Sequence, residues 1–451
     1  MGTMNDWTEA EVRAERAREL YDDGRLAEAA AELRAAIGVN PYNPSWHFNL
    51  GLTLEAMDDH GRACLAYEAA LELSPDDIEA LNCLGVSMNR QGRYAEALEQ
   101  FQHIERIDPG YEPAYCNRIV SYTELGEHDK AEVMFYLARL FKDECPLCCY
   151  NIGNSFYNNG QYGRAIDCWK QTLRIDPTHP QANARIADAY WAQDQLATAG
   201  DYYECELGLY PDDADTRLDY GELLVQQRRL EAAERQFRRV LEDDPEHAGA
   251  YFALGSLALP LGRLDEAERL FQLVLRIDAE YPGAHARLGQ IMLRRGRRSR
   301  AAGHFLAELK RSGNDASALA ELGRLLLEAG QLRHAHAVFQ RLTWLRPDDP
   351  QAHHNLAVCC FRLERMDEGI RHCRHAVKLR PDYSLALYNL ALAHYRTGSR
   401  ARAQRYVSRA MALAPRQDAI RRLARQLRAD GFWGRLRQTV RRVLGRHGEA
   451  G

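Results

Sequence analysis

The chain has 451 residues, which is enough for two or three ordinary domains or for one long repeat array. Hydrophobic residues make up 46% of the chain and the formal net charge is −5, so the composition supports a folded core. No stretch approaches the roughly 18 consecutive apolar residues of a membrane-spanning helix, which argues against an integral membrane protein.

The N-terminus and the cysteines both indicate a cytoplasmic protein. The first residues, MGTMNDWTEAEV, lack the basic and apolar regions of a secretory signal, and Asp6 stands where a myristoylation signal has Ser or Thr. The 11 cysteines are odd in number and irregularly spaced, which favours reduced thiols over a disulfide framework. Only 5 of the 59 basic residues are Lys, a bias that indicates a GC-rich, bacterial source.

A period of 34 residues runs through twelve consecutive units of the chain. One position of each unit holds Gly or Ala, except in the fourth unit, and a second position 16 residues later holds a large apolar residue in most units. The first column is Ala17, Gly51, Gly85, Ile119, Gly153, Ala187, Gly221, Gly255, Gly289, Gly323, Ala357 and Ala391. The second column is Leu33, Tyr67, Phe101, Phe135, Trp169, Tyr203, Phe237, Phe271, Phe305, Phe339, Cys373 and Val407.

This pattern predicts two helices per unit. Small residues stand where the two helices approach closely, and the large residue fills the space beside them. A third column, four residues before the large one, holds Ala in every unit except the eleventh, which has Gly369. Gly between the helices supplies a turn in eight units, and Pro ends the second helix in nine of twelve. Each hairpin can bury its apolar face only by stacking on its neighbours.

The pattern resembles the tetratricopeptide repeat family, whose motif places Leu-Gly, an aromatic residue, Ala, Phe and Pro at these offsets. The resemblance covers residues 10–415 and leaves 416–451 as a capping helix and a basic tail. It implies an all-α fold, a right-handed α-α superhelix (solenoid) of about twelve 34-residue hairpins whose inner groove is lined mainly by the first helices. No unit has the family's Trp four residues before the Gly, and Asp143, Ala279 and Gly313 replace the Pro.

The segment CPLCC opens the fifth unit with Cys145, Cys148 and Cys149, and Cys116 lies one unit earlier. Two thiolates at Cys-x-x-Cys spacing can begin a zinc site, but no second Cys-x-x-Cys follows. We therefore expect small residues packed at a repeat junction, and neither a metal nor another cofactor. In the eleventh unit Cys360 and Cys373 fall on core positions and are predicted to be core thiols. His372 and His375 have no visible third ligand, so no metal is expected there either.

Asparagines recur where the family faces its groove. Three of them fill all three groove positions of the fifth unit: Asn151, Asn154 and Asn158. Four others repeat the first of these positions: Asn49, Asn117, Asn355 and Asn389. A primary amide offers donors and an acceptor that match a peptide group, so a column of amides could hold an extended chain. It resembles the asparagine ladder of the O-linked N-acetylglucosamine transferases; the alternatives are a solvated helix face or bonding within the repeats.

Other side chains are predicted to anchor a peptide beside this column, since five amides at about 1 kcal/mol each fall short of the roughly 8 kcal/mol of micromolar binding. The fifth and sixth units offer a mixed set: Tyr150, Tyr157, Arg185, Asp188 and Trp191. The last units offer a set that favours acidic ligands: His354, Phe361, Arg362, Tyr388, Tyr395 and Arg396. In the ninth unit, the run of Arg from 294 to 300 is a solvated turn or a patch for an acidic partner.

The C-terminal region departs from the repeat. Residues 417–430 carry a helical stripe of Ile420, Leu423 and Leu427, which predicts a helix that caps the last hairpin. The following segment is a basic amphipathic helix that could bind an anionic membrane, dock on an acidic partner or pack on its own chain. The residues expected to act there are Trp433, Arg435, Leu436, Val440, Arg441, Arg442, Val443 and Leu444.

Charge is unevenly distributed along the chain. Residues 280–451 carry 33 basic and 14 acidic residues, a net +19, so the remainder carries −24. This gradient predicts head-to-tail self-association at low salt. No phosphate-binding glycine loop, nucleophile elbow or ligand set for a metal appears, and the repeats leave no room for a catalytic domain.

The sequence therefore predicts a non-enzymatic scaffold that binds peptide segments of other proteins in its groove. The alternatives are a substrate-delivery subunit of a glycosyltransferase or protease complex, or a nucleic-acid-binding regulator; nucleic acid is the less favoured partner.

Overall fold

The computed structural model describes residues 4–429, and all the regular secondary structure in this range is helical. Odd-numbered helices are the first helices of the hairpins and even-numbered helices are the second. The helices are α1 (Met4–Asp22), α2 (Leu26–Val39), α3 (Pro44–Ala56), α4 (His60–Leu73), α5 (Ile78–Arg90), α6 (Tyr94–Ile107), α7 (Glu112–Glu124), α8 (His128–Phe141), α9 (Pro146–Asn158), α10 (Tyr162–Ile175), α11 (Ala182–Ala192), α12 (Leu196–Leu209), α13 (Ala214–Gln226), α14 (Leu230–Asp243), α15 (Ala248–Ala258), α16 (Leu264–Ile277), α17 (Ala284–Arg294), α18 (Arg298–Arg311), α19 (Ala316–Glu328), α20 (Leu332–Leu345), α21 (Pro350–Arg362), α22 (Met366–Leu379), α23 (Ser384–Arg396) and α24 (Arg400–Leu413). A further helical segment occupies 418–429.

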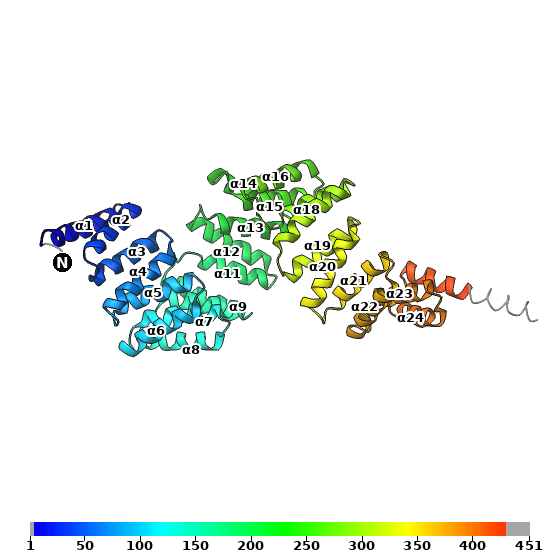
Figure 1. The fold of residues 1–451 in the computed structure, drawn as a ribbon, viewed down its shortest axis with the longest axis horizontal. Coiled ribbons are helices and arrows are strands. Elements are labelled where there is room, and N and C mark those ends of the chain that lie inside the picture. The colour runs from blue at the N-terminus through cyan, green and yellow to red at the C-terminus, as the bar shows by residue number, and fades with distance from the viewer. Residues whose placement is uncertain (1–3, 430–451) are drawn as a thin grey trace, which may run out of the picture. The chain divides into compact units, whose positions relative to one another are not determined.

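The chain forms two compact units, residues 1–236 and 237–451, with the boundary inside α14. In the first unit each helix from α1 to α12 packs against the next one, and in the second each helix from α15 to α23 does so. First helices of successive hairpins also touch, as α7 does α9 and α21 does α23. Figure 1 shows this succession of hairpins in each unit. The predicted all-α hairpin repeat is thus what the chain forms.

The small and large columns of the repeat meet as predicted. A Cβ atom added to Gly289 would lie 2.3 Å from Cε1 of Phe305, far closer than any contact allows. The same relation joins Gly51 to Tyr67 and Gly153 to Trp169, and the three large partners are completely buried. These glycines are therefore required because an aromatic ring occupies the space where their side chain would stand.

The fourth unit shows what happens when the small residue is lost. Ile119 is completely buried in the place of the glycine, and Phe135 is only partly buried. The Phe135 ring lies instead 5.6 Å from that of Tyr136 and 5.8 Å from the guanidinium carbon of Arg139. In the eleventh unit Cys373, opposite Ala357, is fully buried like Cys360, which confirms both as core thiols.

The turn glycines adopt the left-handed conformation that their position requires. The eight predicted turn glycines, from Gly24 to Gly398, have φ between 71° and 83°. Four units lack the glycine and place another residue there at φ of 58–62°: Asp58, Asp194, Arg228 and Glu364. A left-handed L-residue costs roughly 1–2 kcal/mol, so these four turns are strained relative to the others.

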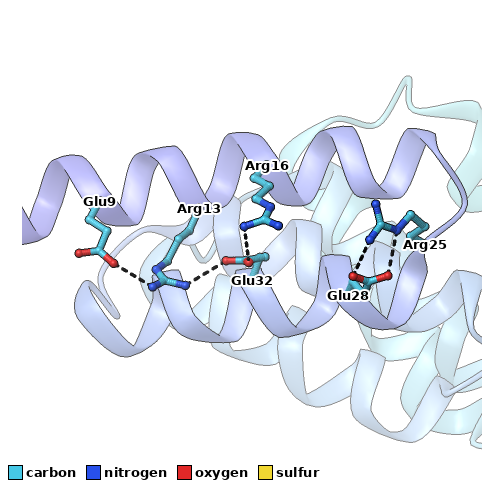
Figure 2. Close-up of polar contacts among 6 residues, drawn as sticks. All are labelled: Glu9, Arg13, Arg16, Arg25, Glu28 and Glu32. Atoms are coloured by element: carbon cyan, nitrogen blue, oxygen red, sulfur yellow. Dashed lines mark hydrogen bonds and ion pairs between the residues drawn. The ribbon is translucent and has the colours of Figure 1, made fainter.

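Ion pairs connect the first two helices on their solvent side, as Figure 2 shows. Arg13 of α1 lies 2.8 Å from Glu9 and 3.1 Å from Glu32 of α2, and Arg16 lies 3.4 Å from the same Glu32. Most of these side chains are substantially exposed, so solvent screens the pairs and they add little to stability.

The described C-terminal helix caps the last hairpin as predicted. Ile420, Leu423 and Leu427 are buried in one cluster with Leu387 of α23 and Val407 of α24. The eight predicted tail residues from Trp433 to Leu444 lie outside the described residues, and the boundary between the repeats and the tail remains a prediction. Among the described residues, no helix is long and apolar enough to cross a membrane.

Candidate functional site

A cavity of about 240 Å³ opens between the first helices of the last two hairpins. Its lining comes from α21 and α23, with one residue from α22, because the first helices of successive hairpins lie next to each other. The lining residues are Val358, Phe361, Arg362, Met366, Asn389, Leu392, Ala393 and Arg396. The structure thus brings together four of the residues predicted to face the groove: Phe361, Arg362, Asn389 and Arg396.

The Phe361 ring lies against Gly369 of α22, which leaves room for the ring because glycine has no side chain. A Cβ atom on Gly369 would lie 2.4 Å from Cε1 of Phe361, so no other residue leaves the ring where it is. Sequence reasoning missed this function of Gly369. The signal was present, because Gly369 is the single glycine in a column that is otherwise Ala.

Two guanidinium groups border the apolar part of the cavity. Nη1 of Arg362 donates a 3.1 Å hydrogen bond to the carbonyl oxygen of Leu327 in the preceding first helix, which fixes the direction of that side chain. Arg396 is exposed and has no hydrogen bond or ion pair with any described residue. The cavity therefore combines an apolar floor with unneutralised positive charge.

A buried histidine orients the amide of Asn389. Burial lowers the pKa of His354 to about 4, so the ring is neutral at physiological pH. The Nδ2 atom of Asn389 lies 2.9 Å from Nε2 of His354 and can only donate, so Nε2 accepts and Nδ1 carries the proton. Nδ1 then donates to the hydroxyl of Tyr383 at 3.2 Å. This chain turns the amide nitrogen of Asn389 inward and leaves its carbonyl oxygen as the group available to a ligand.

The predicted amide column forms bridges between consecutive first helices. Asn117 donates to Oδ1 of Asn82 at 2.9 Å, and Asn151 donates to the carbonyl oxygen of Cys116 at 3.5 Å. Together with Asn389 and His354, each bridge joins residues 35 apart in the sequence. These bonds run between consecutive units, whereas the alternative raised by the sequence was bonding within a single unit. They occupy one donor of each of these three amides. The oxygen of Asn154 is buried and has no hydrogen-bond partner among the described residues.

A mixed-charge group gathers on the sixth and seventh units. Arg185 lies 3.3 Å from Asp188, which also accepts a 2.5 Å hydrogen bond from the hydroxyl of Tyr203. Burial, reinforced by the neighbouring Asp188, raises the pKa of Asp219 to about 6. Asp219 is a member of this group that sequence reasoning did not select, although it stands at the same register as Asn151 and Arg185.

The remaining predicted groove residues differ in accessibility. Tyr150 packs on His179 with ring centroids 4.7 Å apart, Trp191 donates to Gln226, and Tyr395 accepts a 3.0 Å hydrogen bond from Gln426. Of the predicted set, Asn49, Asn158, Arg185, Arg362 and Arg396 are exposed, and Asn151 and His354 are buried. The others are partly buried: Asn117, Tyr150, Asn154, Tyr157, Asp188, Trp191, Asn355, Phe361, Tyr388, Asn389 and Tyr395.

Solved structures align with this chain at low sequence identity. The hetero-tetramer Cut9–Hcn1 of APC/C aligns with a TM-score of 0.41 at 13% identity, over 93% of this chain and 96% of that one. Tom70 of yeast aligns with a TM-score of 0.40 at 15% identity, over 98% and 99%.

Curated relatives share shorter segments. The BBSome complex member BBS4 of Bos taurus is 24% identical over 184 residues, which are 41% of this chain and 35% of the relative. The peroxisomal targeting signal receptor of Kluyveromyces lactis is 24% identical over 198 residues, 43% of this chain and 34% of that protein. The matched part thus spans about a third of the length of these relatives.

Family models cover more of the chain. Models of the tetratricopeptide repeat match residues 15–78, 150–214 and 218–285, residues 66–99, and residues 348–416. A model of subunit 3 of the anaphase-promoting complex (cyclosome) matches residues 300–376. The repeat models together span more than half of the sequence and agree with its period of 34 and its paired helices, so the chain belongs to the tetratricopeptide repeat family.

Proposed function

We propose that this protein is a scaffold without chemistry of its own that binds extended peptide segments of partner proteins along its first helices. The cavity between α21 and α23 is its best-defined binding position. The single observation that carries the proposal is the juxtaposition of an apolar floor, two guanidinium groups and an oriented amide in that cavity. The relatives named as targeting signal receptors support peptide recognition as the use of such a surface.

The chemistry of the cavity favours one kind of peptide. A volume of about 240 Å³ accommodates one bulky apolar side chain beside Phe361. Carboxylates on the flanking residues would pair with Arg362 and Arg396, and a backbone N–H would donate to the oxygen of Asn389. Two charge-assisted hydrogen bonds at about 1.5–3 kcal/mol each and a buried apolar side chain at about 1.5–3 kcal/mol total about 4.5–9 kcal/mol. This range includes the roughly 8 kcal/mol of micromolar binding at its upper end.

Peptide selection tests this proposal directly. A displayed library of random peptides is selected against the intact protein and against the double variant Arg362→Glu, Arg396→Glu. We expect the intact protein to enrich peptides with a large apolar residue next to Asp or Glu, and the variant to lose them, because reversed charge repels the carboxylates.

The matched control reverses two exposed arginines on the second helices of the same two hairpins, Arg371→Glu in α22 and Arg405→Glu in α24, which do not line the cavity. This control should enrich the same peptides as the intact protein. Recovery of the same acidic peptides by the cavity variant would disprove the assignment of the cavity.

A further inference from the structure

Four potential metal ligands converge where the fourth hairpin meets the fifth. Glu112 and Cys116 belong to α7, and Cys145 and Cys148 belong to the start of α9. Their four ligand atoms all lie within 4.8 Å of one another. The sequence predicted only packed small residues here, because the carboxylate of Glu112 completes a set that the cysteine spacing alone does not reveal.

The local structure explains the convergence. Glu112 and Cys116 are four residues apart on a helix, so their side chains share a face. Cys145 is the N-cap of α9, and its sulfur accepts a 3.3 Å hydrogen bond from the backbone N–H of Cys148. Because α7 and α9 pack against each other, the two pairs face one another.

The contacts bring the ligand atoms together, and the thiols are buried. Cys148 Sγ lies 3.0 Å from a carboxylate oxygen of Glu112, and Asn151 Nδ2 lies 3.7 Å from Cys116 Sγ. The three sulfur-bearing residues are buried, with 1–6% of their surface exposed, and none of them forms a disulfide. A Zn–S bond of about 2.3 Å in a tetrahedral site puts neighbouring sulfurs about 3.8 Å apart, a separation that lies within the 4.8 Å limit of the cluster.

We propose that Glu112, Cys116, Cys145 and Cys148 bind one zinc ion. Three thiols and one carboxylate within 4.8 Å of one another suit a soft, four-coordinate ion, and binding releases the thiol protons. With four protein ligands the site has no open position, so it is structural and not catalytic. It would join α7 to α9 at the end of the fourth 34-residue unit. That unit has Ile119 in place of the small residue and Asp143 in place of the terminal Pro.

Metal analysis of the purified full-length protein tests the site. We expect one zinc per chain after dialysis against a weak chelator, and loss of that zinc in Cys116→Ser and in Cys148→Ser. The matched control is Cys373→Ser, the same change at a buried thiol outside the cluster, which should retain one zinc. Replacement of zinc by Co²⁺ should give the intense visible bands and sulfur-to-metal charge-transfer absorption of a tetrahedral thiolate site.

A milder variant guards against misfolding. Glu112→Gln keeps the shape of the side chain and removes its charge, so it should fold normally, as measured by circular dichroism, while the Kd for Zn²⁺ rises about tenfold or more. Retention of zinc by Cys116→Ser, or no zinc bound by reduced wild-type protein supplied with Zn²⁺, would overturn the proposal. A Cys145–Cys148 disulfide in protein purified under reducing conditions would overturn it as well.

Discussion

At the scale of single residues, the repeat depends on the fit between glycine and an aromatic ring. Gly289→Ala places a methyl group 2.3 Å from the Phe305 ring. We expect a loss of about 1–3 kcal/mol in the free energy of unfolding, because the overpacked ring must leave its position. Urea denaturation measures this change.

The control for this prediction lies in the following helix. Gly303 is exposed in α18 and has open space where a Cβ would be. Gly303→Ala should therefore stabilise the protein by about 0.5–1 kcal/mol through helix propensity alone. If Gly289→Ala also stabilises the protein, steric fit is not the reason why the spacing of small and large residues recurs along this chain.

Asp219 makes stability depend on pH. Its pKa rises from 3.8 to about 6, through burial and then through Asp188 and other nearby carboxylates. The folded state binds the proton more tightly than the unfolded state, so stability is greatest below pH 4 for this group and is lost as the pH rises through about 6. Asp219→Asn should remove this dependence and raise the unfolding free energy at pH 7 by about 2 kcal/mol.

Denaturation curves measured between pH 5 and pH 8 test this prediction. The control is Asp212→Asn, at an exposed position just before α13, the helix that carries Asp219. Equal pH profiles for the wild type and Asp219→Asn would refute it.

Residue-level fit also marks the limit of what the sequence reveals. The close approach of Gly51 to Tyr67 follows from the period, because the same offset recurs along the chain. The displacement of Phe135 by Ile119, the support of Phe361 by Gly369 and the approach of Glu112 to Cys148 depend on side-chain directions. Each occurs once in the chain, so the period itself does not encode it. The breaks in the columns at Ile119 and Gly369 mark two of the three places but do not give the contacts made there.

At the scale of helices, two first helices begin in an unusual way. The N-cap residues of α11 and α17, Gln181 and Gly283, are left-handed and provide no side-chain cap. A buried carboxylate from the second helix of the same hairpin replaces the cap. Glu206 accepts from the N–H groups of Gln181 and Asn183 at 2.7 and 3.1 Å, and Glu308 accepts from Gly283 at 2.9 Å.

Removal of this carboxylate should therefore destabilise α11. Glu206→Ala leaves two backbone N–H groups without an acceptor, and we expect a loss of about 1–3 kcal/mol. Thermal denaturation followed by circular dichroism measures it, with the exposed Glu99→Ala as control. A loss no larger than that of the control would show that water satisfies the helix start equally well.

The helices themselves were predictable and this capping was not. The turn glycines and the terminal prolines defined nearly all hairpins, because these residues act locally on the backbone. Glu206 lies 25 residues from the N–H group that it caps, so no local rule connects the two.

At the scale of the molecule, the main helix contacts of the described residues lie within hairpins and between neighbouring hairpins, so a local defect should remain local. One core cluster extends from Ala258 to Cys360, and a separate one, from Leu387 to Leu427, closes the same unit. In Gly289→Ala, hydrogen exchange should accelerate in the helices of the first cluster, such as α17 and α18. It should stay unchanged in α24 and in 418–429.

Mass spectrometry of exchanged peptides gives this profile segment by segment. A uniform acceleration across residues 237–429 would mean that the unit unfolds in a single cooperative step, contrary to this prediction.

The bridges between residues 35 positions apart bear on how such a gene can change in length. Asn117 with Asn82 and Asn389 with His354 use the same offset, as does Arg362 with Leu327. When recombination duplicates or deletes one whole period, the first helices at the junction again carry side chains at equivalent positions, so the same bridges can form and the product can fold at once. An insertion or deletion of any other length shifts these side chains out of register and breaks the bridges at that point. Selection can therefore lengthen or shorten the array in single hairpin steps without passing through an unfoldable ancestor.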